Sequence, residues 1–123
     1  MQRIAFWNQA RTILLGDDIE VADSSLHRAW GLLGRTALQA GGGLWIKPSS
    51  GVHTFGMRFP IDVVGLDKAY RVVRLWHDLQ PWRITSISTA VRSVVELPAG
   101  AIARSGLLVG DTLLPEVRQE KAA

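Results

Sequence analysis

IDVVGLDKAYRVVRLWH, residues 61–77, is the segment that decides the fold class of this chain. It contains two short apolar runs, residues 61–66 and 70–77, with the polar break Asp67-Lys68-Ala69 between them. Short apolar runs bounded by turn residues are typical of β-strands. The segment therefore predicts two strands of a sheet separated by a turn.

The same pattern of short runs and turn residues extends through most of the chain. Further strands are expected at residues 2–7, 11–15, 19–22, 44–47, 52–57, 84–87, 90–97 and 112–117. Breaks such as Gly16-Asp17-Asp18 fall at the spacing of antiparallel sheets. The predicted fold is mostly β: a small antiparallel β-sandwich or partly closed barrel with one or two short helices.

Two short helices interrupt the predicted strands. The Asp-Ser-Ser triplet at residues 23–25 supplies side-chain oxygens that cap a helix N-terminus. In the helix that follows, near residues 24–34, we expect Trp30 to pack against the sheet. A second helix is expected at residues 101–105, ended by Gly106.

Length and composition indicate one globular domain, residues 1–123. The chain is 47% apolar and 20% charged, which is typical of a folded protein with its own core. It contains no cysteine, which removes disulfides, thiolate nucleophiles and zinc ribbons. No apolar run approaches the ~20 residues of a membrane span, and the first residues lack a signal-peptide pattern. We expect a cytoplasmic protein that does not enter a membrane.

The net charge of +3 raises the question of a nucleic-acid partner. Proteins that bind nucleic acid cluster Lys and Arg on one face or tail. Here the basic residues between positions 28 and 104 are spread singly along the chain. The charge pattern therefore argues against nucleic acid as a partner.

His53 and Asp62 form the most informative polar pair, because both lie among apolar residues. If Arg58-Phe59 connects two antiparallel strands, His53, Met57 and Asp62 project to one face, with His53 and Asp62 diagonal neighbours at ~7–8 Å. That arrangement would put the two side chains within reach of a direct or water-bridged hydrogen bond. The alternative is that Asp62 fixes a loop by accepting backbone N–H bonds and that a carbonyl satisfies His53.

Other catalytic or metal-binding patterns are absent from the sequence. The three histidines, at positions 27, 53 and 77, have no ligand spacing, so no metal or cofactor is expected. Asp62 and Glu96 are the only acids within apolar strands and would suit glycoside hydrolysis if they faced one cleft. We expect Glu96 instead in a surface or edge salt bridge. Trp82, which follows Pro81 in a loop, is expected to be exposed.

The sequence resembles a bacterial and archaeal family, the domain of unknown function 192 family. The resemblance is carried by Arg28, GLLGR (31–35), HTFGMRFPIDV (53–63), Pro81-Trp82, ELPAG (96–100) and GLLVGD (106–111), and it covers about residues 19–115. It implies a small β-rich domain without an agreed activity. Relatives often carry Cys where this chain has Ser49, so no thiol chemistry is expected at that position.

Three functions are consistent with these observations. The first is a non-catalytic module that binds a small molecule or peptide in a cleft; the expected binding residues are His53, Thr54, Met57, Asp62, Trp82 and Arg28. The second is a hydrolase in which His53 is the general base and Asp62 orients it. The third is an interaction protein that presents an exposed sheet edge, as a monomer or a homodimer.

Overall fold

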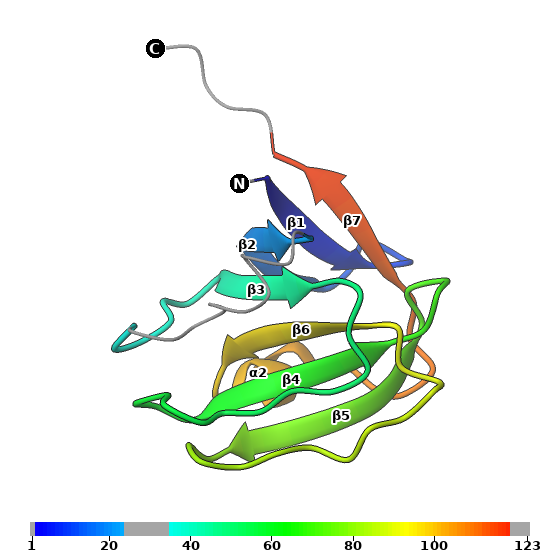
Figure 1. Ribbon diagram of the computed structural model, residues 1–123. Helices are drawn as coiled ribbons and strands as arrows, with labels where there is room; N and C mark the ends of the chain where they lie inside the picture. The colour runs from blue at the N-terminus through cyan, green and yellow to red at the C-terminus, as the bar shows by residue number, and fades with distance from the viewer. Residues whose placement is uncertain (1, 24–34, 119–123) are drawn as a thin grey trace.

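Seven strands and one short helix form the part of the chain that the computed structural model describes, residues 2–23 and 35–118. The strands are β1 (Arg3–Asn8), β2 (Leu14–Ala22), β3 (Gly42–Ile46), β4 (Ile61–Leu66), β5 (Val72–Leu79), β6 (Ser93–Pro98) and β7 (Leu113–Val117), and the helix is α2 (Ala101–Ser105). They form one sheet in the order β5-β4-β6-β3-β2-β1-β7 (Figure 1). The predicted mostly β fold is confirmed.

The sheet is mixed, whereas the sequence predicted an antiparallel one. β2 and β3 pair in parallel, and every other strand ladder of the described chain is antiparallel. A parallel pair needs a long connection, and residues 23–41 supply it. The predicted turn between β4 and β5 is confirmed, because the Asp67 carboxylate accepts the N–H groups of Ala69 and Arg71.

The sheet curls until its two edge strands approach at one end without closing into a barrel. An isolated antiparallel bridge joins Arg71, just before β5, to Thr112, just before β7. Val72 donates its N–H to the carbonyl of Asp111 at 2.7 Å, and Leu113 donates to the carbonyl of Tyr70 at 2.9 Å. Figure 1 shows the meeting point on the right, from which β5 and β7 diverge.

The curled sheet has a core on each face. The inner core takes buried side chains from all seven strands and from α2, and includes Phe6, Trp45 and Tyr70 in edge-to-face contact. The outer core is centred on Leu44, Met57, Ile61, Val63 and Val94. Consecutive residues along β4, and along β6, therefore face different cores. This alternation decides which core each carboxylate of these strands faces.

Three of the predicted strand assignments are wrong. Strand β2 joins the end of the predicted run 11–15 to the run 19–22, and residues 11–13 lie outside it. Within β2, Gly16 is buried against the carbonyl of Gly41, and an irregular register with β1 replaces the expected turn. Residues 52–57 and 84–87 form loops joined by the isolated bridge between His53 and Ile84 and by hydrogen bonds between Val52 and Thr85. Gly56 has a φ of 80°, which breaks an extended strand.

The short helix is confirmed at the predicted residues. α2 spans Ala101–Ser105 and ends at Gly106, whose φ of 71° is the left-handed conformation that glycine adopts without strain. The helix predicted near residues 24–34, with Trp30 and Arg28, lies outside the described residues.

Candidate functional site

Thr54 joins the two loops that replace the expected strands. Its side chain is fully buried. The Thr54 hydroxyl donates to the carbonyl of Gln80 at 2.7 Å and accepts the N–H of Arg83 at 2.8 Å. The Thr54 backbone bonds Arg83 and Trp82 as well. These bonds hold residues 52–58 against residues 80–88 and fix the side chains that both loops present.

Those loops present an aromatic surface, which we define as His53, Phe55, Trp82 and Ile84. The rings of His53 and Phe55 stack with centroids 5.3 Å apart, and Phe55 lies 6.1 Å from Trp82. Phe55 is 44% exposed, Trp82 65% and Ile84 66%. Adjacent exposed apolar side chains of this size are typical of contact sites with other molecules.

The backbone at Trp82 is strained. Its φ of 64° is a left-handed conformation that a bulky residue adopts at a cost of roughly 1–3 kcal/mol. Hydrogen bonds from the N–H groups of Trp82 and Arg83 to Thr54 hold this conformation. Strain and an exposed indole therefore fall on one residue, which is typical of a residue with a binding role.

The two loops that form the aromatic surface carry basic side chains and no acidic ones. His53, Arg58 and Arg83 are exposed, and residues 52–60 and 81–88 contain no Asp or Glu. A surface that combines exposed rings with one sign of charge favours an anionic partner over a cationic one.

Asp62 does not face this surface. Its side chain is 1% exposed, and its carboxylate accepts the N–H groups of Asp78 at 2.9 Å, Gly100 at 3.1 Å and Ile102 at 2.9 Å. Among the described residues no hydrogen bond joins His53 to Asp62, and the strand pairing predicted to make them neighbours is wrong. The register argument fails because residues 52–57 are not a strand beside β4. The alternative is confirmed for Asp62, which fixes loops, whereas the carbonyl partner expected for His53 is absent from the described residues and His53 is exposed.

The expected binding residues therefore divide into two groups. His53, Thr54 and Trp82 come together at the aromatic surface, where Trp82 is exposed as predicted. Met57 is 6% exposed and belongs to the outer core, and Asp62 is interior. Arg28 lies outside the described residues. The sequence did not single out Phe55, whose position beside Gly56 in a turn was the available signal.

Glu96 is buried in an apolar setting, so the surface salt bridge expected for it is wrong. It is 4% exposed, and its Oε2 atom finds no hydrogen-bond partner among the residues that the structure describes. Burial raises the pKa of Glu96 to about 8, and the charge of Arg35 opposes that shift. Glu96 lies opposite Val63, while Asp62 lies opposite Leu97, so the two carboxylates project to different faces. They cannot act together across one cleft as glycoside hydrolysis requires.

In the described part of the chain, His, Asp and Glu side chains nowhere gather in a group of three that could hold a metal ion. Among the helices placed by the structure, none has the length and apolar character needed to cross a bilayer.

Comparisons with known proteins agree with the fold. The DUF192 family model, described as "Uncharacterized ACR", matches residues 7–114. A UPF0127 protein of Pyrococcus horikoshii is 33% identical over 96 residues, covering 76% of this chain and 83% of the relative. Another, from Pyrococcus abyssi, is 31% identical over 109 residues, covering 85% and 91%.

A solved structure has the same fold. The crystal structure of a protein of unknown function from Novosphingobium aromaticivorans superposes with a TM-score of 0.77 at 20% identity. It covers 91% of this chain and 83% of that protein. At this level of identity the likeness establishes the fold alone.

Proposed function

This chain belongs to the DUF192 family of uncharacterized proteins, and from that premise we propose that it is a non-catalytic module that binds a peptide segment of a partner protein on its aromatic surface. The proposal rests on Trp82, whose exposed indole lies on a strained backbone. Its ring lies beside the ring of Phe55, which stacks on His53. Thr54 keeps this arrangement in place before any partner arrives. Such preorganisation lowers the entropy cost of binding.

A peptide suits this surface better than a small molecule does. Small-molecule sites are concave and enclose most of the ligand. The rings of Phe55 and Trp82 stand on loops with about half or more of their surface exposed. An extended peptide can lay apolar or proline residues across successive rings, and Ile84 extends the contact. Arg58 and Arg83 favour Asp or Glu beside those residues.

Hydrolysis has less support than binding. A histidine that acts as general base is commonly oriented by a carboxylate. The carboxylate expected for that role, Asp62, is engaged by three backbone N–H groups in the interior. His53 contacts the ring of Phe55, a partner that suits a recognition surface.

Fluorescence anisotropy with labelled peptides tests the proposal. The probes are short peptides that combine Pro or aromatic residues with Asp or Glu, and the same sequences with Lys or Arg in place of the acids. Wild-type protein should bind the acidic set and bind it more weakly as salt is raised. Trp82→Ala and Phe55→Ala should each weaken binding about tenfold or more, as expected for central aromatic contacts.

The matched control is Leu108→Ala, which removes an apolar side chain of similar exposure, 66%, from a different loop. It should leave peptide affinity unchanged. Equal affinities for wild type and a folded Trp82→Ala variant would overturn the proposal. So would a concentration-dependent dimer in sedimentation that the Trp82 variant abolishes, because a second copy would then occupy the surface.

A further inference from the structure

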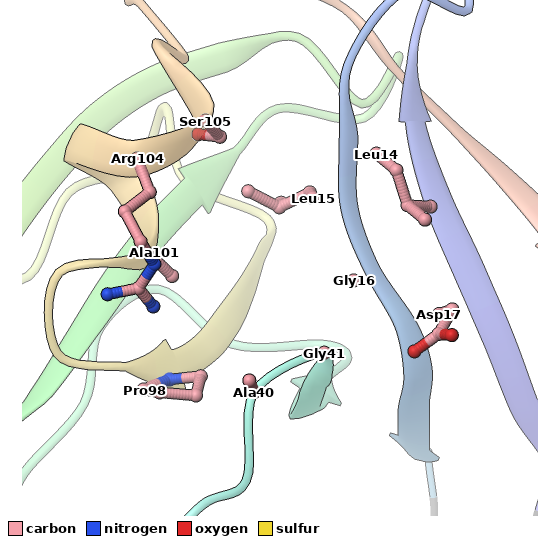
Figure 2. A pocket seen from close by; sticks show the side chains of 10 residues that line it. All are labelled: Leu14, Leu15, Gly16, Asp17, Ala40, Gly41, Pro98, Ala101, Arg104 and Ser105. Atoms are coloured by element: carbon pink, nitrogen blue, oxygen red, sulfur yellow. The ribbon is translucent and has the colours of Figure 1, made fainter.

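A cavity of about 410 Å³ lies between α2 and β2, apart from the aromatic surface. Its volume is within the range of small-molecule sites. The lining residues are Leu14, Leu15, Gly16, Asp17, Ala40, Gly41, Pro98, Ala101, Arg104 and Ser105 (Figure 2). Most of them are small or apolar side chains, and the cavity wall combines apolar with polar surface.

Opposite charges stand on the two sides of the cavity. Figure 2 shows Arg104 on the α2 side and Asp17 on the β2 side, with Leu15 and Gly41 in the region between them. Both charged side chains are exposed. The ion pairs formed within residues 2–23 and 35–118 involve neither of them. Each is therefore available to a ligand.

Two glycines make room for these charged groups. A Cβ atom at Gly41 would lie 2.6 Å from Oδ1 of Asp17, and one at Gly100 would lie 2.8 Å from Nη1 of Arg104. Both glycines have positive φ, 81° and 91°, which other residues adopt with strain. The backbone on each side thus leaves space for a carboxylate or a guanidinium at the cavity.

Asp62 fixes the wall that carries Arg104. Its Oδ2 atom accepts the N–H groups of Gly100 and Ile102, the residues at the start of α2. Asp62 comes from β4, so the sheet itself holds the helix in place. The core therefore sets the position, relative to β2, of the α2 backbone that carries Arg104.

We propose that this cavity binds a small zwitterion, a free amino acid or dipeptide with an apolar side chain. The ligand carboxylate would lie on the Arg104 guanidinium, which suits paired hydrogen bonds to carboxylates. The ligand ammonium group would lie on the Asp17 carboxylate. Its side chain would lie against Leu14, Leu15 and Ala101.

Titration calorimetry of the whole chain with four probes tests each charged contact separately. The probes are L-leucine, glycyl-L-leucine, N-acetyl-L-leucine, which lacks the ammonium group, and L-leucinamide, which lacks the carboxylate. At least one zwitterion should bind with a dissociation constant of about 1 mM or below. N-acetyl-L-leucine and L-leucinamide should each bind about tenfold more weakly than L-leucine. If leucine binds more tightly than glycyl-leucine, the cavity is an amino-acid site; if glycyl-leucine binds more tightly, it is a dipeptide site.

Removing a charged group from the protein should weaken binding as much as removing its partner group from the ligand. Arg104→Gln should weaken the binding of leucine about tenfold. It should leave the affinity for leucinamide unchanged, because leucinamide lacks the carboxylate that Arg104 would contact. Asp17→Asn should likewise weaken the binding of leucine about tenfold and leave the affinity for N-acetyl-leucine unchanged, because N-acetyl-leucine lacks the ammonium group. The control Arg83→Gln, an exposed cation at the aromatic surface, should change none of these affinities.

Two results would overturn the proposal. The first is no saturable binding of either zwitterion by the folded wild type. The second is equal affinity for zwitterions and blocked analogues, which would show an apolar cavity without charge recognition. The Trp82→Ala variant separates this site from the aromatic surface, because it should lose peptide binding and keep zwitterion binding.

Discussion

Glu96 has the least favourable environment of any carboxylate placed by the structure. Its side chain lies on the outer face of the sheet, opposite Leu44 and Val63, and no group in residues 2–23 or 35–118 bonds its Oε2 atom. The ionised form of a buried carboxylate loses hydration that Arg35, which pairs with Glu20, only partly replaces. The protonated form of Glu96 is therefore favoured in the folded protein.

This environment predicts a stability that depends on pH. The pKa of Glu96 rises from 4.5 to about 8 on folding, so the folded state binds the proton more tightly than the unfolded state does. The free energy of unfolding should therefore fall as pH rises from about 4.5 to about 8. Glu96→Gln should remove this fall and be more stable than wild type at pH 8, by an amount on the order of a few kcal/mol.

Urea denaturation of both proteins across that pH range measures the effect. Glu116→Gln is the matched control, because Glu116 is 49% exposed and pairs with Arg11 at the surface. It should leave the pH dependence almost unchanged. Parallel stability curves for wild type and Glu96→Gln would show that Glu96 ionises without penalty.

At the level of elements, α2 depends on a residue from another part of the chain. It has five residues, and the cap residue Gly100 offers no side chain to its first N–H groups. Helices of this length are marginal in isolation. Asp62 of β4 supplies the missing acceptor through its bonds to Gly100 and Ile102. α2 should therefore be stable only when it is docked on the sheet.

Asp62→Ala should detach this helix. It leaves three backbone N–H groups without acceptors, which costs about 1–3 kcal/mol for each buried group that water does not reach. The unfolding midpoint should fall, and hydrogen exchange at Gly100 and Ile102 should become faster. In the control Asp78→Asn, which changes an exposed carboxylate, exchange at both amides should stay slow. Unchanged exchange in Asp62→Ala would contradict this account of α2.

At the scale of the whole molecule, β7 completes the curled sheet. It pairs with β1 at one edge, buries Leu113 in the inner core and meets the start of β5 through the bridge between Arg71 and Thr112. Val117, at the far end of the strand, is 61% exposed. β7 therefore stabilises the fold mainly through its first half.

A truncation after Gly110 should abolish cooperative unfolding. It removes Leu113 from the core, exposes the ladder edge of β1 and breaks the contact between the two ends of the sheet. The loss should appear as a broad, early thermal transition in circular dichroism. Truncation after Arg118 keeps β7 and the bonds of Arg118 to Asp18 and Arg3, and it should melt like the full chain. A sharp transition at the wild-type midpoint in the shorter protein would show that the sheet is stable without β7.

The sequence alone determined the local features. Short apolar runs between turn residues gave the mostly β class, the bounds of β4 and the turn at Asp67, because strands and turns follow from nearby side chains. Gly106 marked the end of α2 for the same reason. The exposure of Trp82 followed from the preceding proline and the loop composition.

Only the tertiary structure decided which residues meet. The parallel pairing of β2 with β3, the curl that joins Arg71 to Thr112 and the capping of α2 by Asp62 all link distant segments. A register slip of one residue reverses the face on which a side chain lies, and a loop read as a strand removes the register altogether. His53 therefore faces Phe55, Asp62 faces the interior, and Arg104 and Asp17 share a cavity that no local pattern reveals.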